Sequence, residues 1–113
     1  MGVDPNVAII GAGPAGLMAA EVLLAKDIAV NIFEAKPTIG RKLLMAGKSG
    51  LNITHTENFK LFLSRFSAQF NTLENSIRSF TPTMLQQWTS NLGIETFEGS
   101  SKRVFPREMK ASP

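Results

Sequence analysis

The chain has 113 residues, of which 43% are hydrophobic and 19% are charged, and its formal net charge is +3. This length allows one small domain with its own core, and the composition is that of an ordinary globular protein rather than a disordered one. Because the chain contains no cysteine, disulfides, a CxxC redox pair and a thiolate metal site are excluded, and any redox chemistry must come from a bound cofactor.

Charge and the remaining composition narrow the function further. The sequence contains two short groups of basic residues, Arg41/Lys42/Lys48 and Lys102/Arg103/Arg107/Lys110. A nucleic-acid-binding arm is normally longer and denser, so no nucleic acid is expected as a partner, whereas cofactor phosphates explain the first group. One histidine, His55, cannot form a metal centre alone and is expected to be a surface or hydrogen-bonding residue. No signal-peptide pattern or membrane-length apolar run is present, which predicts a cytoplasmic protein without a membrane partner.

The first third of the sequence predicts a strand, a glycine turn, a helix and a second strand. Asn6–Ile10 is a continuous apolar run, typical of a strand buried on both faces of a parallel sheet. Residues 11–16 interrupt it with glycines, and Pro14–Lys26 is rich in helix-forming residues, with proline in the first turn where it is tolerated. Ile28–Phe33 is a second β-branched run that ends at Glu34. This order predicts a βαβ unit with a right-handed crossover, and therefore an α/β fold.

The middle of the chain predicts a long loop followed by an amphipathic helix. From Ala35 to Thr56 no period is sustained, and a loop of this length in a small domain is usually functional. The helix is predicted from apolar residues at helical spacing: Phe59, Phe62, Leu63, Phe66 and Phe70. Such an aromatic stripe is typical of core packing rather than of a cofactor site.

The last third predicts another helix and a β-hairpin. Thr81 and Pro82 are typical of a helix start, and Leu85, Trp88 and Leu92 form its apolar stripe before Gly93 ends it. Ile94–Phe97 and Arg103–Phe105 predict two short strands that are joined through residues 99–101.

One motif in the predicted βαβ unit carries chemistry. Gly11, Gly13 and Gly16 have the spacing GxGxxG between a strand and a helix, and Glu34 ends the next strand 18 residues after Gly16. This is the context of a dinucleotide fingerprint. Gly11 allows the turn, Gly13 allows a pyrophosphate to approach the backbone, and Gly16 allows the helix to pack on the sheet. The helix N-terminus attracts the phosphates, while Glu34 accepts from ribose hydroxyls and repels the 2′-phosphate of NADP.

A second glycine-containing segment is not a nucleotide site. Gly47-Lys48-Ser49 resembles the end of a P-loop, but residue 42 is lysine where that loop requires glycine, and no strand precedes it. A nucleoside triphosphatase is therefore not expected.

The sequence resembles the BaiN-type NAD(P)/FAD-dependent oxidoreductases, a family of bacterial flavoproteins. The resemblance rests on residues 11–20 (GAGPAGLMAA), 33–37 (FEAKP), 40–55 (GRKLLMAGKSGLNITH), 103–106 (RVFP) and 110–112 (KAS). Many members carry Gly-Gly-Arg-Cys-Asn where this chain has Lys-Ser-Gly-Leu-Asn at 48–52, which suggests a distinct subfamily.

The resemblance implies a domain organisation. Residues 1–56 would form the FAD-binding βαβ unit with its cofactor loop, as in glutathione-reductase-type flavoproteins, and residues 57–113 would begin an inserted helical and β-hairpin domain. The chain is then expected to be the N-terminal portion of a longer FAD-dependent oxidoreductase, for which NAD(P)H is a candidate electron donor. The 113-residue chain alone is expected to be inactive, because the flavin performs the chemistry in such enzymes and the segments that enclose it would follow residue 113.

The resemblance also implies roles for particular residues, none of them catalytic. The pyrophosphate would lie against Gly11, Gly13, Pro14, Ala15 and Gly16, and Glu34 would hold the ribose. Ala35 and Lys36 would flank the adenosine, Arg41 and Lys42 would face phosphate or ribose, and Asn52 and Thr54 would lie nearer the flavin.

Two alternatives stay open at this point. The same βαβ unit serves NAD-binding dehydrogenases, and the chain could equally be a truncated, non-catalytic remnant or interaction module. A parallel sheet also needs cover on both faces, and only two of its strands are predicted here. The isolated chain is therefore expected to expose apolar surface and to self-associate or associate with a missing C-terminal part, binding FAD and ADP weakly and with little preference.

Overall fold

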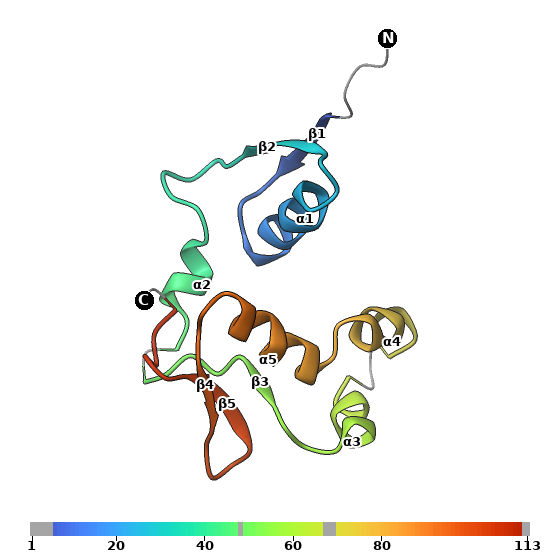
Figure 1. The fold of residues 1–113 in the computed structure, drawn as a ribbon, viewed down its shortest axis with the longest axis vertical. Helices are drawn as coiled ribbons and strands as arrows, with labels where there is room; N and C mark the ends of the chain where they lie inside the picture. The colour runs from blue at the N-terminus through green and yellow to red at the C-terminus, as the bar shows by residue number, and fades with distance from the viewer. Residues whose placement is uncertain (1–5, 48, 67–69, 112–113) are drawn as a thin grey trace. The chain divides into compact units, whose positions relative to one another are not determined.

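The computed structural model describes residues 6–47, 49–66 and 70–111 (Figure 1). Lys48, in the segment that resembles a P-loop, and Ser112, in a segment that carries the family resemblance, lie outside this part of the chain. The contacts form two units, one ending at Ala46 and the other beginning at Gly47. Residues 47–56, which the sequence groups with the cofactor unit, pack with the second unit, whereas the assignment of an inserted domain from residue 57 stays a prediction.

The first unit is built as the sequence predicts. It contains β1 (Asn6–Ile10), α1 (Pro14–Leu24), β2 (Ala29–Phe33) and a short α2 (Arg41–Met45). β1 and β2 pair in parallel, from Asn6 opposite Ala29 to Ile10 opposite Phe33. α1 connects them and contacts both strands (Figure 1). The predicted βαβ unit is therefore confirmed.

The first unit differs from the prediction in three places. β2 begins at Ala29 rather than at Ile28. α1 ends before Lys26, because the chain turns out of the helix through Asp27, whose φ of 56° is left-handed. The predicted loop from Ala35 to Thr56 contains α2, which begins after a left-handed Gly40 with φ of 62°. A five-residue helix is too short to produce a readable period.

The two faces of the small sheet differ in burial. Ile9 points towards α1, since its Cγ2 lies 3.2 Å from where a Cβ on Gly16 would stand, and Ala20 on the helix is 5% exposed. Ile10 and Phe33, paired on the other face, are 82% and 57% exposed. The prediction that β1 is buried on both faces is therefore wrong for this chain, because α1 covers one face only.

The second unit combines three helices with a three-stranded antiparallel sheet. The helices are α3 (Phe59–Ser64), α4 (Phe70–Ser79) and α5 (Pro82–Asn91), and the strands β3 (Thr54–His55), β4 (Thr96–Glu98) and β5 (Arg103–Pro106) have the order β3-β5-β4. The pairing of β4 with β5 confirms the predicted hairpin. The buried residues of the second unit include Val104 and Leu63, which are 1% and 4% exposed, and Thr89.

The sequence predicts one continuous helix from Phe59 to Phe70, but the structure does not contain it. α3 ends at Ser64, and the amides of Arg65 and Phe66 bond to carbonyls three residues back, a tightened last turn. The Arg65 guanidinium reaches back to both carboxylate oxygens of Glu57 at 2.8 Å. Among the described side chains of the stripe, only Leu63 is buried, while the rings of Phe62 and Phe66 lie 5.4 Å apart and are half-buried. Residues 67–69 lie outside the described part.

The start of α5 gives a stability prediction. The Thr81 hydroxyl accepts a hydrogen bond from the Met84 amide at 3.2 Å, and Pro82 occupies the first helical position. Thr81→Ala should lower the free energy of unfolding of the second unit by about 1 kcal/mol, because an amide at the helix start loses its acceptor. Urea unfolding followed by circular dichroism measures this change. Thr83→Ala, at an exposed position of the same helix, is the control, and equal effects of both substitutions would contradict a capping role.

Candidate functional site

The three glycines of the turn between β1 and α1 are needed for different reasons. Gly11 has φ of 103°, which other residues rarely adopt, and its amide donates to the Phe33 carbonyl at 2.8 Å. A Cβ on Gly16 would collide with the carbonyl oxygen of Gly11, so α1 could not approach the turn. Gly13 has an ordinary φ of −82°, and a Cβ there would meet nothing within 4 Å. The fold itself therefore requires Gly11 and Gly16 but not Gly13.

The N-terminus of α1 is open. Gly13 is its N-cap, Pro14 follows, no side chain caps the helix, and its first turn has no acidic residue. The amides of Ala15 and Gly16 stand in the first turn, where a helix offers no acceptor. Such N–H groups, together with the positive end of the helix dipole, are what the start of a helix offers to an anion.

The turn is anchored by Ala12, which is 0% exposed. Its amide donates to Oε2 of Glu34 at 2.8 Å, and its carbonyl accepts from the Gly40 amide at 2.8 Å. Both peptide groups of one buried residue are thus bonded to the segment after β2. The position of the glycine turn is therefore set by Glu34 and Gly40 as well as by β1.

Glu34 lies at the end of β2 with a carboxylate that is already engaged. Oε1 accepts from the Lys36 amide at 2.9 Å, and Oε2 from Ala12. These bonds, the one from Lys36 first, hold the pKa of Glu34 below its usual value of 4.5. Each carboxylate oxygen can accept a second hydrogen bond, so the ionised group can still bind two hydroxyls of a ligand.

The other predicted site residues of the first unit are exposed. Ala35, Lys36, Arg41 and Lys42 all lie at the surface, and the Arg41 Nη1 lies 3.4 Å from the Thr38 hydroxyl. The first unit thus contains all but two of the predicted residues: Gly11, Gly13, Pro14, Ala15, Gly16, Glu34, Ala35, Lys36, Arg41 and Lys42. Their roles towards a cofactor stay predictions.

Asn52 and Thr54 belong to the second unit. The Asn52 side chain donates to the Thr54 carbonyl at 2.7 Å and to the Val104 carbonyl at 3.2 Å, while Thr54 pairs with Val104 in the sheet. The Asn52 amide nitrogen therefore fastens the loop to β5, a role that sequence analysis missed. Its oxygen remains available as an acceptor, and the predicted flavin contacts of both residues stay predictions.

Sequence analysis also missed Gly40 as a contributor to the turn. One signal was available, since glycine is among the residues that are preferred directly before a helix. The hydrogen bond from Gly40 to Ala12, 28 residues earlier, cannot be predicted from the residues around Gly40.

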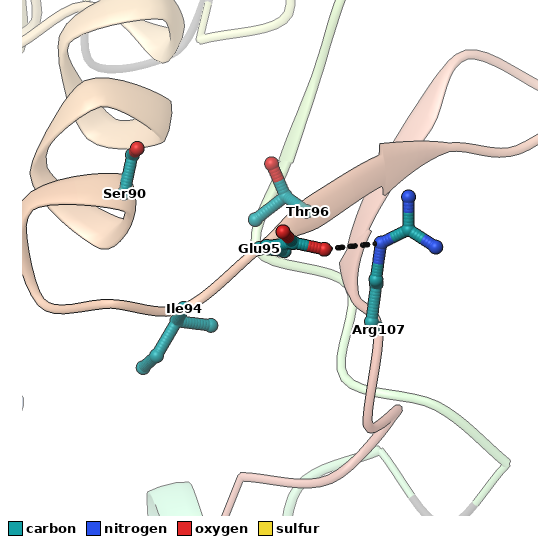
Figure 2. Close-up of a pocket in the computed structure, with 5 residues that line it drawn as sticks. All are labelled: Ser90, Ile94, Glu95, Thr96 and Arg107. Atoms are coloured by element: carbon teal, nitrogen blue, oxygen red, sulfur yellow. Dashed lines mark ion pairs between the residues drawn. The ribbon is translucent and has the colours of Figure 1, made fainter.

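Elsewhere, the second unit has one shallow pocket of interest, lined by Ser90, Ile94, Glu95, Thr96 and Arg107 (Figure 2). Its ion pair between Glu95 and Arg107, at 2.7 Å, is 75% and 67% exposed and therefore contributes little energy.

His55, as expected, is a hydrogen-bonding residue, whose Nδ1 accepts from the Glu57 amide at 3.1 Å.

Two classes of feature are absent from the residues that the structure describes. They contain no cluster of three or more His, Cys, Asp or Glu that could hold a metal. No helix in ranges 6–47, 49–66 and 70–111 is long and apolar enough to cross a membrane.

Comparison with known families agrees with the parallel βαβ unit. Residues 5–113 match the family described as HI0933-like protein Rossmann domain. The chain belongs to this family. The Rossmann-like α/β fold and the family resemblance are thereby confirmed, and the chain carries a Rossmann-type dinucleotide-binding domain.

Two curated relatives are similar over parts of the chain. A protein of Escherichia coli (strain K12) named "Putative oxidoreductase AegA" is 53% identical over 38 residues, covering 34% of this chain and 6% of that protein. Thiamine thiazole synthase of Pyrobaculum aerophilum is 32% identical over 82 residues, covering 73% of this chain and 31% of that enzyme. The chain thus spans less than a third of either relative.

The Glu34 contacts predict a pH dependence. A carboxylate whose pKa is lowered by folding contributes stability that is present above its usual value of 4.5 and lost as the pH falls through the lowered pKa. The amide NMR signals of Ala12 and Lys36 should therefore shift together at a pH below 4.5. Glu34→Gln should abolish this shared titration, and amide signals that stay constant through this acid range would contradict the bond to Ala12.

Proposed function

We propose that the first unit binds the ADP part of FAD within a flavin-dependent oxidoreductase. The observation that carries the proposal is the open space at Gly13. Backbone conformation accounts for Gly11 and packing accounts for Gly16, but neither accounts for a glycine between them. A ligand that must touch the backbone there does account for it, and a pyrophosphate at a helix N-terminus is such a ligand.

The chemistry around Gly13 fits the two ends of an ADP group. The amides of Ala15 and Gly16 supply donors for the diphosphate, which has acceptors only. Glu34 supplies the complementary group, an ionised carboxylate whose oxygens can accept further hydrogen bonds from the hydroxyls of a ribose. The same negative charge disfavours a ribose that carries a 2′-phosphate.

The preference for FAD over NAD rests on the family and on the segment after Glu34. Residues 40–55 resemble those of BaiN-type flavoproteins, and one relative is named as an oxidoreductase. When bound, a flavin passes hydride between a nicotinamide donor and a substrate, while the residues of this chain bind and orient its ADP part. Yellow colour of the purified protein, with absorbance near roughly 450 nm, distinguishes a flavoprotein from an NAD-dependent dehydrogenase.

Substitution of Gly13 tests the proposal directly. Gly13→Ala should weaken ADP binding by about tenfold or more, equivalent to about 1.4 kcal/mol, because the added methyl group occupies the space of a phosphate. NMR titration of residues 1–113 with ADP measures this affinity.

Two matched variants separate ligand binding from folding. Gly13→Ser adds a Cβ but keeps a favourable N-cap, so the helix should be retained. ADP binding should nevertheless be weakened, as in Gly13→Ala. Gly16→Ala should instead disrupt the packing of α1, with loss of helical signal. Wild-type affinity in both Gly13 variants would exclude a pyrophosphate at this glycine.

The ribose contact has its own test. Glu34→Gln should weaken ADP binding roughly 10- to 100-fold, because charge-assisted hydrogen bonds to the hydroxyls are lost. With 2′-deoxy-ADP as ligand the same substitution should have a smaller effect, since one of the two hydroxyls is already absent. If the substitution weakens both ligands equally, Glu34 acts on the turn through Ala12 and not on the ribose.

A further inference from the structure

The bond between Gly40 and Ala12 joins the glycine turn to a pair of cations. The Gly40 amide donates to the buried Ala12 carbonyl at 2.8 Å, and the Gly40 carbonyl accepts from Leu44 at 3.0 Å, which begins α2. Arg41 and Lys42 are the first two residues of that helix. A single residue therefore connects the turn at one end and the basic segment at the other.

The conformation of Gly40 is what makes this connection. Its φ of 62° is left-handed, yet a Cβ at this position would meet nothing within 4 Å. Glycine is therefore favoured here by backbone conformation and not by crowding. The left-handed step turns the chain so that the amide reaches back to Ala12 while the next residues enter a helix.

The two cations that Gly40 introduces have no carboxylate partner within the described ranges. By contrast, Arg65, Arg78 and Arg107 each pair with a glutamate at 2.7–2.8 Å. Within the part of the chain that the structure describes, the Arg41 guanidinium makes one long hydrogen bond, from Nη1 to the Thr38 hydroxyl at 3.4 Å. Arg41 and Lys42 are thus exposed positive charges that follow directly after the residue bonded to the glycine turn.

We propose that Gly40 is a positioning residue, which holds Arg41 and Lys42 beside the glycine turn so that they neutralise the diphosphate bound there. This inference rests on the proposed function and adds to it the structural feature that positions the two cations. This feature is the backbone hydrogen bond from Gly40 to Ala12, because buried Ala12 fixes the position of the turn and, through Gly40, that of the cations.

The test measures ADP affinity of residues 1–113 by NMR titration at low and at high salt. Gly40→Ala should weaken ADP binding roughly five- to tenfold at low salt. Alanine disfavours the left-handed φ of this position, so the backbone would change there and displace the cations. At high salt the difference should shrink, since screening removes the contribution of exposed charges. Gly40→Asn should restore affinity towards the wild-type value, because asparagine tolerates the left-handed conformation.

A double-mutant cycle identifies the route of the effect. In a chain that carries Arg41→Gln and Lys42→Gln, the further change Gly40→Ala should have no additional effect on ADP affinity. An effect that persists in this background, or that is equal at both salt concentrations, would overturn the positioning role while leaving ADP binding in place. Failure of the wild-type chain to bind ADP at all would instead remove the proposed function and this inference together.

Discussion

The first unit depends on the two hydrogen bonds of Ala12. This residue is fully buried, and each of its peptide groups has one partner, Glu34 for the amide and Gly40 for the carbonyl. An unpaired buried peptide group is costly, so both of these hydrogen bonds stabilise the first unit. Three segments that are distant in sequence therefore meet at one residue: the glycine turn, the end of β2 and the start of α2. Residues predicted to bind different parts of a cofactor are in this way parts of a single bonded structure.

This coupling changes how Glu34 is understood. From the sequence, its role is to accept hydrogen bonds from a ribose. In the structure the carboxylate also holds the turn through Ala12 and the following chain through Lys36. A carboxylate with two oxygens can serve both purposes, because each oxygen keeps a second acceptor position. The hydrogen bonds from the Lys36 and Ala12 amides lower the pKa of Glu34 below its usual value of 4.5, so the carboxylate stays ionised further into the acid range.

The parts of this chain that sequence predicts correctly are those set by local pattern. β1, α1, β2 and the hairpin of β4 and β5 follow from apolar runs, helix formers and turn residues. The parts that sequence misses depend on contacts between distant residues. α2 is defined by a left-handed glycine bonded to Ala12, and the early end of α3 coincides with the return of Arg65 to Glu57. For the site, the motif predicts Glu34 and the glycines, whereas only the structure reveals that the Asn52 amide is bonded to β5.

Charge explains why the basic segment matters to the proposed site. The diphosphate of a dinucleotide carries about two negative charges, whereas a helix N-terminus supplies roughly half a positive charge. Glu34 adds a further negative charge to the same region, although its carboxylate is bonded to Ala12 and Lys36. The open end of α1 can therefore orient a diphosphate but cannot balance it. Arg41 and Lys42 supply two positive charges, and they can act only if the chain after β2 returns to the turn, which is what the bond from Gly40 to Ala12 achieves.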